Sequence, residues 1–573
     1  MEGVHVLATQ DGHPSIPTED TDTQPAPLGI DVPEDTGEGG RLRMIVQLVK
    51  RSFGVKDLAA MRLSLPASLL EPIPNLEYWH YLDRPDLFAT INDHEDPLDR
   101  MLAVLRFTFS KDIRHIRGKP CKPYNSVLGE NFRMHWDVTP ILYDAEDRTP
   151  AITTYIDAPP KPPHVHSEAG SIKGTKGTLK SGRVGGFGSL LSMKGWSSPA
   201  VDKPASTVVE SNLSAQLSNL SLASTQTGES CSGSASASTS SPPTSMSTGP
   251  GALRIAYLTE QISHHPPISA YVAACPARHI TLSGIDQISV RVLPSASLRV
   301  SSGTMNKGLF LSMDGGPGAG EHYQITHPVA NVNGVLRGSF YATVHESTIV
   351  TCTGGPGVGN GEWLRAIIEY KEESWLGKPH YLVEGVVHRY DPSEHEHEEW
   401  TKVKHVPPAR VVAYFEGCWR NVVRWRSATP ASDGSGRSTP SLGGKAAHPT
   451  EWTTLIDLTP LLAVPKIVRP ISRQLPSESR RLWESVTTKL LSKEYGEATR
   501  AKQVIEQRQR DEAADRKRRG VEFVPRYFEK DIQSGVPTLT QAGREALETE
   551  IKYGHEDENE DGVERDDGGA SAS

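Results

Sequence analysis

A succession of short apolar runs constrains the fold of this chain more than any other feature of its sequence. Between residues 251 and 417 these runs alternate apolar with polar side chains or are rich in β-branched residues, and Gly, Pro, Asn and Asp separate them. The runs are LRIAYL, ISAYVA, HITLSG, ISVRVL, LRVSS, LFLSM, HYQITH, GSFYATV, STIVT, WLRAIIEYK, HYLVEGVVHRY and VVAYFEG. Long helical patterns do not intervene, so the sequence predicts an antiparallel meander rather than parallel β–α–β units.

A meander of this many strands leaves exposed edges unless it curls or closes. We therefore expect a closed or nearly closed barrel that is wide enough for an interior cavity. Two helical segments flank the predicted barrel: one covers Asp96 to Phe109, and a long charged one covers Ser477 to Arg519. The second segment has only sparse apolar residues, which are Trp483, Leu490, Leu491, Val504 and Ile505.

Composition separates one folded domain from several segments outside it. Residues 1–40 are rich in Pro, Asp, Glu, Thr and Gly and lack apolar periodicity, which predicts a disordered tail. Residues 165–250 are first glycine-rich and then rich in Ser and Thr, which predicts a disordered insertion. A shorter loop is expected at 428–449 and an acidic tail at 546–573. The folded domain is therefore expected within 41–545.

Charge, hydropathy and cysteine spacing exclude several classes of protein. The 61 Lys and Arg against 70 Asp and Glu give a net charge of −9, which argues against a general nucleic-acid binder. No apolar run reaches the roughly 18 residues of a membrane span, and the N-terminus lacks the pattern of a signal peptide. The five cysteines form no C-x-x-C pair, which predicts a reduced, cytosolic protein without structural zinc. They are Cys121, Cys231, Cys275, Cys352 and Cys418.

An amphipathic helix is predicted just before the folded domain. Apolar residues recur at helical spacing, namely Leu42, Ile45, Val46, Val49 and Phe53. Three basic residues face away from this stripe, namely Arg43, Lys50 and Arg51. Such a helix closes over a hydrophobic tunnel, lies in an anionic membrane interface, or packs on the core of the domain.

The segment EQISHHPPISA, from Glu260 to Ala270, carries the strongest local signal. Successive side chains of a strand point to opposite faces, but Pro266 and Pro267 interrupt the strand directly after His264 and His265. The turned backbone aims both rings at one ligand. Two imidazoles suit an anion with several oxygens, whereas a third zinc ligand is missing nearby. The alternative is a pair of structural histidines.

These residues resemble a known family. EQISHHPP matches the EQxSHHPP signature of the oxysterol-binding protein family of lipid-transfer proteins. KPYNSVLGE, from Lys122 to Glu130, resembles the family's KPxNPxLGE segment, although Ser126 stands where proline is usual. HPVANVNGVLRGSFYATV resembles a family strand pair, and Leu475 to Arg481 followed by KQVIEQRQR resembles its C-terminal helical signature. The resemblance covers roughly Arg41 to Lys530, except for the insertion. It implies an α+β, mainly β fold: an incomplete antiparallel barrel around a lipid tunnel, with an N-terminal lid and a C-terminal helical subdomain.

The resemblance also implies a headgroup site for phosphatidylinositol 4-phosphate. His264 and His265 correspond to phosphate contacts, and Lys122 and Asn125 to the lysine and asparagine of KPxN. On the C-terminal helix, Lys502, Glu506 and Arg510 match a family spacing of four residues, which places all three on one helix face. Glu506 is expected to orient the two cations rather than touch the phosphate. Without the motif, these three residues form an ordinary solvated ladder of ion pairs.

The function implied is lipid transfer without catalysis, cofactor or metal. A sterol, or alternatively phosphatidylserine, enters the barrel and is exchanged for phosphatidylinositol 4-phosphate between membranes. The protein is expected to be a cytoplasmic monomer in transient peripheral contact with intracellular membranes, without a nucleic-acid partner. Two alternatives stay open: a lipid sensor or scaffold without net transport, and a metal-dependent hydrolase that uses histidine-rich stretches such as SEHEHEEW around His395 and His397.

Overall fold

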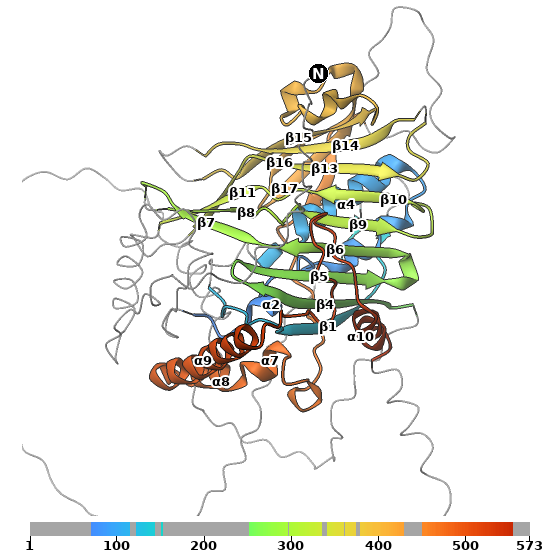
Figure 1. Cartoon of the computed structure of the whole chain (residues 1–573). Helices are drawn as coiled ribbons and strands as arrows, with labels where there is room; N and C mark the ends of the chain where they lie inside the picture. Colours follow the sequence, from blue (N-terminus) through green and yellow to red (C-terminus); the bar gives the residue numbers. More distant parts are fainter. Residues whose placement is uncertain are drawn as a thin grey trace, which may run out of the picture. The chain divides into compact units, whose positions relative to one another are not determined.

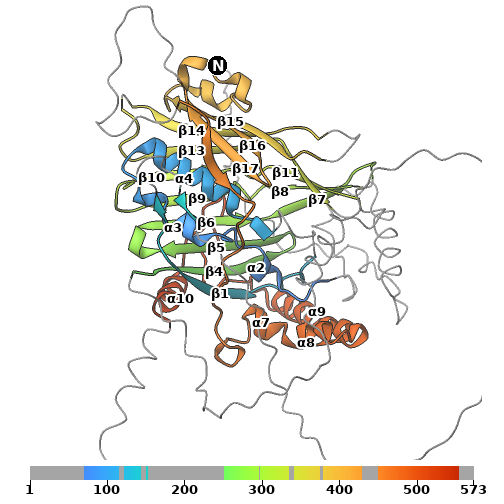
Figure 2. The ribbon, with the colours of Figure 1, turned by 180° about the vertical axis from the view of Figure 1, so that it is seen from behind.

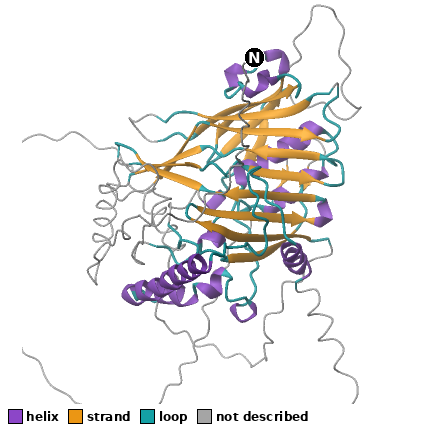
Figure 3. Cartoon of the chain, in the orientation of Figure 1, coloured by secondary structure: helices purple, strands orange, loops and turns teal. Residues whose placement is uncertain are grey.

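The computed structural model describes residues 70–114, 122–143, 150–152, 251–295, 297–334, 341–359, 361–373, 379–428 and 450–553. β-Strands dominate these residues (Figure 3). In sequence order, the α-helices lie at the beginning and the end of the described chain. The predicted fold class, a mainly β chain built on a large antiparallel sheet, is confirmed. The predicted lid residues, the tail 1–40 and the insertion 165–250 lie outside the described residues, as do 429–449 and 554–573.

Twelve strands of the described chain form one antiparallel sheet (Figure 1). In spatial order they are β1 (Asn131–Val138), β4 (Leu253–His264), β5 (Pro267–Cys275), β6 (Ile280–Asp286), β9 (Leu309–Met313), β10 (Glu321–Ile325), β13 (Ser347–Gly354), β14 (Trp363–Tyr370), β15 (Leu382–Tyr390), β16 (Val411–Cys418), β17 (Val422–Ser427) and β18 (Thr453–Asp457). Neighbours in the sheet are mostly neighbours in sequence, as in a meander. All of the apolar runs named above contribute residues to a strand.

A second, four-stranded sheet interrupts this meander. It contains β12 (Tyr341–His345), β11 (Val329–Asn333), β8 (Leu298–Ser302) and β7 (Ile288–Val292), in this spatial order. One face is apolar, because Val290 lies opposite Val300 and Val300 lies opposite Ala330. The single continuous meander expected from the sequence is therefore divided between two sheets. Alternating apolar residues predict a strand but do not say which strand it pairs with. Two further short strands, β2 (Leu142–Tyr143) and β3 (Pro150–Ala151), pair with each other.

The large sheet is an incomplete barrel. Its edge strands β1 and β18 each pair with one neighbour among the described strands, and not with each other. The chain that follows β18 returns to β1: the N–H of Ile467 donates to the carbonyl of His135 at 2.8 Å, and the N–H of His135 donates back at 3.0 Å. The same returning chain forms an isolated bridge between Glu478 and Asn131. The edge of β1 is thus partly covered without a closed ladder of hydrogen bonds.

Helices from the N-terminal part of the described chain lie over one face of the sheet (Figure 2). They are α2 (Asn75–Tyr78), α3 (Pro85–Ala89) and α4 (Pro97–Ser110). The predicted helix at 96–109 is confirmed as α4, which Asp96 caps by accepting from the N–H of Leu98 at 2.7 Å. Its residues from Arg100 to Ser110 are buried on all sides. A helix of this kind belongs to the core, because no face is left for water.

The charged C-terminal segment folds as several helices rather than one. They are α7 (Ser479–Leu482), α8 (Glu484–Leu491) and α9 (Tyr495–Arg519), and α8 packs on α9. A further helix, α10 (Gln541–Lys552), covers β4 and β1. This helix corrects the predicted start of the acidic tail at residue 546, because Leu547 and Glu550 are buried. Their apolar and ion-pair contacts outweigh the acidic composition of that stretch.

Short 3-10 turns complete the description: η2 (Ile91–Asp93), η3 (Pro276–Arg278), η5 (His395–Glu398), η6 (Val403–His405), η7 (Pro408–Arg410) and η8 (Ile471–Arg473). Across the described part of the chain, no helix is both long and apolar enough to span a membrane. Cys275, Cys352 and Cys418 are free thiols.

Candidate functional site

The β4–β5 hairpin presents the two adjacent histidines. β4 ends at His264, and β5 begins at Pro267 after a turn in which the Ser263 hydroxyl donates to the carbonyl of Pro266 at 2.8 Å. The rings of His264 and His265 lie side by side, with centroids 4.4 Å apart and planes inclined by 59°. Both histidines are half-buried. The turn therefore gathers both imidazoles at one end of the hairpin, while the expectation that they face one ligand stays a prediction.

The KPYNSVLGE segment forms a loop that leads into β1. Lys122 and Asn125 are both exposed, and the Lys122 ammonium donates to Asn125 Oδ1 at 2.6 Å. Two backbone hydrogen bonds join this loop to the chain that follows the predicted lid. The N–H of Glu71 donates to the carbonyl of Lys122 at 3.0 Å, and the N–H of Tyr124 donates to the carbonyl of Ile73 at 3.2 Å. Lys122 and Asn125 thus form one polar pair on a fixed backbone.

Backbone pairing places this loop beside the histidine hairpin. The N–H of Gly129 donates to the carbonyl of Gln261 at 2.9 Å, and the N–H of Gln261 donates to the carbonyl of Glu130 at 2.8 Å. Gln261 precedes His264 by only three residues. Gly129 has φ +77°, and a Cβ there would lie 3.3 Å from the ring of Phe523, so glycine suits this position for two reasons.

Helix α9, which carries the predicted residues Lys502, Glu506 and Arg510, contacts the same loop through Gln509. The side-chain carbonyl of Gln509 accepts from the N–H of Leu128 at 3.0 Å, which ties the helix to the KPYNSVLGE loop. Lys502 is 3% exposed, and its ammonium donates to Glu506 at 2.5 Å. That Glu506 orients the cations toward a phosphate stays a prediction. Arg510 is exposed and donates to the side chain of Gln507 at 2.9 and 3.1 Å.

The structure also reveals buried glutamates that sequence reasoning did not single out, although they lie inside the quoted motifs. Glu130, the last residue of KPYNSVLGE, is 1% exposed and accepts from Ser479 Oγ at 2.7 Å and from Trp483 Nε1 at 3.0 Å. Glu260, the first residue of EQISHHPP, accepts from the backbone N–H groups of Arg526 and Tyr527 at 2.8 and 2.7 Å. Burial raises the pKa of both carboxyl groups. Each one ties its motif to the C-terminal part of the chain.

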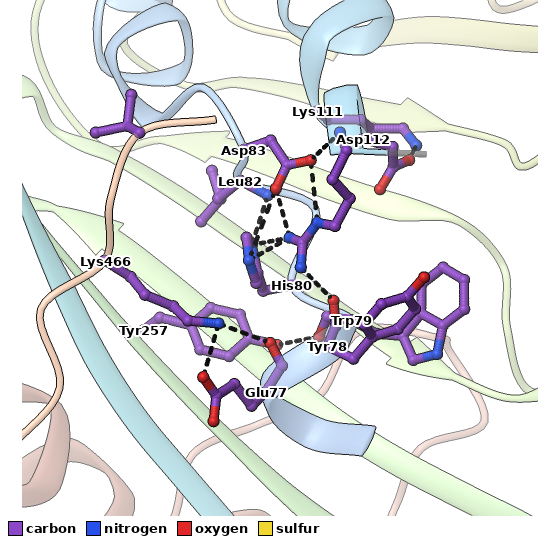
Figure 4. A network of polar contacts seen from close by, with 12 residues as sticks. Glu77, Tyr78, Trp79, His80, Leu82, Asp83, Lys111, Asp112, Tyr257 and Lys466 are labelled. Atoms are coloured by element: carbon purple, nitrogen blue, oxygen red, sulfur yellow. Dashed lines mark hydrogen bonds and ion pairs between the residues drawn. The ribbon is translucent and has the colours of Figure 1, made fainter. Parts of the chain in front are cut away.

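A buried ion-pair network fixes the chain that follows the predicted lid (Figure 4). Glu77 of α2 is 5% exposed and accepts from the Lys466 ammonium at 3.0 Å and from Arg480 at 2.6 and 2.9 Å. Burial alone would raise the pKa of Glu77, but these two cations together lower it to about 2. Nearby, the Tyr257 hydroxyl donates to the carbonyl of Trp79 at 3.2 Å. The network joins α2 to β4, α7 and the chain after β18.

The histidine-rich stretch around His395 has a different environment. His395 and His397 lie in the turn η5, where His395 is exposed and His397 is half-buried. His395 Nδ1 is 3.0 Å from Glu398 Oε1. Within the described ranges, no cluster of three or more His, Cys, Asp and Glu residues is arranged to hold a metal ion.

Comparison with known sequences assigns the chain to a family. The sequence model described as Oxysterol-binding protein matches residues 44–153 and 246–557, and these ranges contain the histidine hairpin, the KPYNSVLGE loop and α9. The chain belongs to the oxysterol-binding protein family. The match leaves out most of the predicted insertion.

Several members of the oxysterol-binding protein family are similar over most of this chain. Oxysterol-binding protein-like protein 1 of Schizosaccharomyces pombe is 36% identical over 528 residues, which is 90% of this chain and 92% of that protein. Human oxysterol-binding protein-related protein 9 is 24% identical over 89% of this chain, but the match covers 51% of that protein. Oxysterol-binding protein homolog 7 of Saccharomyces cerevisiae matches a smaller part: it is 26% identical over 48% of this chain and 53% of that protein. This chain thus spans about half the length of several of its curated relatives.

A solved structure shares the fold. The crystal structure of the Osh1 ORD domain in complex with cholesterol has a TM-score of 0.50 and 16% sequence identity, and the match covers 88% of this chain and 89% of that domain. The incomplete barrel with flanking helices is therefore the fold of an oxysterol-binding domain.

Proposed function

We propose that this protein binds a sterol inside its barrel and exchanges it for phosphatidylinositol 4-phosphate, without catalysing a covalent reaction. The observation that carries this proposal is the joining of three motif segments at one place. The Gly129–Gln261 backbone pair links the KPYNSVLGE loop to the histidine hairpin, and Gln509 links the same loop to α9. Membership of the oxysterol-binding protein family supports lipid binding.

The gathered side chains suit a phosphomonoester. Lys122 donates three hydrogen bonds as an ammonium, and His264 and His265 donate when they are protonated next to an anion. Asn125 Oδ1 receives the Lys122 ammonium at 2.6 Å and so holds the cation in place before a lipid arrives. Charge-assisted hydrogen bonds of this kind are stronger than neutral ones. Lys502 completes the set from α9, oriented by Glu506.

The remaining parts of the proposal follow from the fold and the sequence. A sterol is the proposed cargo because the domain of similar fold was solved with cholesterol. The predicted helix with Leu42, Ile45, Val46, Val49 and Phe53 serves as the lid and meets the anionic membrane with its basic face. The protein acts as a cytoplasmic monomer that touches intracellular membranes transiently.

A liposome exchange assay tests the headgroup site. We expect the double variant His264→Ala/His265→Ala to extract phosphatidylinositol 4-phosphate at least about tenfold less well, because two charge-assisted contacts are lost. Sterol extraction by the same variant should be retained. The matched control is His395→Ala/His405→Ala, which removes two exposed histidines from η5 and η6. Unchanged phosphoinositide extraction by the first variant would contradict the site.

Two further readouts separate the alternatives. Mass spectrometry of co-purifying lipids distinguishes a sterol cargo from phosphatidylserine. Binding of both lipids without net transfer between liposomes would identify a sensor or scaffold instead of a carrier. A stoichiometric transition metal in the purified protein would favour the hydrolase alternative.

A further inference from the structure

Glu130 occupies a junction between the parts of the candidate headgroup site. It ends the loop that carries Lys122 and Asn125, and its own carbonyl pairs with Gln261 of the histidine hairpin at 2.8 Å. Its carboxyl group faces the other way, into α7 and α8. Oε1 accepts from Ser479 Oγ at 2.7 Å, while Oε2 accepts from Trp483 Nε1 and from the N–H of Val127, both at 3.0 Å.

The hydrogen bonds around Glu130 fit both of its protonation states. Ser479 Oγ lies 2.7 Å from Glu130 Oε1 and 3.2 Å from the carbonyl oxygen of Asn131, but a hydroxyl has only one hydrogen. When Glu130 is ionised, the hydroxyl of Ser479 donates to Oε1. When Oε1 is protonated, it donates to Ser479 Oγ, and the hydroxyl turns to the carbonyl of Asn131. Oε2 keeps its two donors in either state.

Charged neighbours of Glu130 have other partners. Arg133 of β1 donates to Glu478 at 2.6 Å, Arg480 pairs with Glu77, and Glu260 of β4 accepts backbone N–H groups. Tyr124 faces Trp483, and its hydroxyl meets Thr487 at 3.0 Å. Burial is the main cause that raises the pKa of Glu130, to about 7, against the three hydrogen bonds that lower it. A change of protonation near neutral pH therefore follows from geometry and burial together.

We propose that Glu130 is a positioning residue of the phosphate site, and that its protonation strengthens binding of the phosphomonoester. This inference rests on the proposed function. Both protonation states preserve the hydrogen bonds that hold the loop, so the geometry around Lys122 is retained. Protonation removes one negative charge from the side of the loop that faces Ser479 and Trp483, and an anionic ligand bound by Lys122 then meets less repulsion. Binding of the anion in turn favours the protonated carboxyl group.

The variant Glu130→Gln provides the first test, because glutamine reproduces the hydrogen bonds of the protonated acid. Its amide nitrogen donates to Ser479, and its carbonyl oxygen accepts from Trp483 and Val127. At about pH 8 we expect it to bind vesicles that contain phosphatidylinositol 4-phosphate roughly three- to fivefold more tightly than the natural protein. The ratio of the two affinities should approach one at about pH 6, where Glu130 is itself protonated.

The two proteins differ only at residue 130, so a pH-dependent difference between their affinities originates at Glu130. An affinity ratio that stays constant between pH 8 and pH 6 would overturn the inference. The positioning role has its own test in Glu130→Leu, which removes all three hydrogen bonds and should weaken binding at every pH, whereas Glu130→Gln restores it. If Glu130→Leu does not fold, Ser479→Ala is the substitute variant, because it removes the hydrogen bond between Ser479 Oγ and Glu130 Oε1. It should likewise weaken binding at every pH.

Unfolding measured without lipid separates this inference from the proposed function. The pKa of Glu130 is raised above its unfolded value of 4.5, so the stability it contributes is present below pH 4.5 and lost as the pH rises through 7. The natural protein should therefore lose stability relative to Glu130→Gln over this window. If the natural protein does not bind the phosphoinositide vesicles at all, the proposed function fails, while this titration still reports on Glu130. A pH-independent difference in stability would overturn its protonation near neutral pH.

Discussion

The exposed cations of the candidate headgroup site differ from the buried carboxylates near them in burial and in role, although some lie only a few residues apart. Lys122 is exposed and donates to Asn125 Oδ1, whereas Glu130, eight residues later, is 1% exposed and accepts three hydrogen bonds. The exposed group stays hydrated and available to an anion. The buried group holds backbone segments together. One motif therefore encodes both ligand chemistry and the scaffold that positions it.

Removing a buried carboxylate should have the largest effect on stability. Glu77→Ala leaves Lys466 and Arg480 without their shared partner, and we expect it to lower the free energy of unfolding by about 4 kcal/mol. The measurement is urea denaturation of the full chain. The control is Glu71→Ala, because Glu71 is exposed and its removal should cost less than about 0.5 kcal/mol. Equal losses of stability in the two variants would contradict the distinction between buried and exposed charged groups.

Acid should affect the same network almost as strongly. The pKa of Glu77 is lowered from 4.5 to about 2, so the stability it contributes is present above pH 4.5 and is lost as the pH falls through 2. This shift corresponds to about 3 kcal/mol. Glu77→Gln cannot ionise, so its stability should fall less with acid than that of the natural protein. Parallel stability curves for the two proteins would argue against the ion pairs with Lys466 and Arg480.

Removing an exposed cation should affect binding instead of stability. We expect Lys122→Ala to weaken binding to phosphatidylinositol 4-phosphate vesicles about tenfold, because a charge-assisted hydrogen bond contributes about 1.5 kcal/mol. Its unfolding free energy should change by less than about 0.5 kcal/mol. Lys402→Ala is the matched control, since Lys402 is exposed and lies outside the candidate site. If Lys122→Ala lowered the free energy of unfolding as much as Glu77→Ala does, Lys122 would be a structural residue instead of a ligand-binding one.

The smallest effect is expected at the end of the site on α9. Arg510 is exposed and donates to Gln507, so Arg510→Ala should weaken vesicle binding only about threefold and leave stability unchanged. Surface plasmon resonance on supported bilayers can resolve this difference. A loss larger than that of Lys122→Ala would show that Arg510 turns toward the ligand when the lipid is bound.

The sequence predicted elements better than it predicted their connections. The apolar runs became strands because alternation of side chains is a local property. The same property does not distinguish the twelve-stranded sheet from the four-stranded one, as β7 and β8 illustrate. The acidic composition after residue 545 concealed α10, because burial of Leu547 against its neighbours is a tertiary effect. The break between α8 and α9 was likewise not visible in a continuous run of charged residues.

The residues of the candidate site were predicted from motifs, while the glutamates that support it were not. His264, Lys122 and Lys502 belong to patterns whose chemistry can be read from residue type and spacing. Glu77 and Glu130 look like ordinary surface carboxylates in the sequence. Only their burial and their distant partners, such as Arg480 and Ser479, distinguish them.

The sequence by itself determined the local properties of this protein: its strands, the buried helix α4, the turn at the histidine pair and the family motifs. Tertiary structure alone decided which strands share a sheet, how the chain after β18 returns to β1, and which charged groups are buried. The physical reason is that periodicity and turn chemistry act over a few residues. Burial and ion pairing instead depend on segments hundreds of residues apart, as between Glu130 and Ser479.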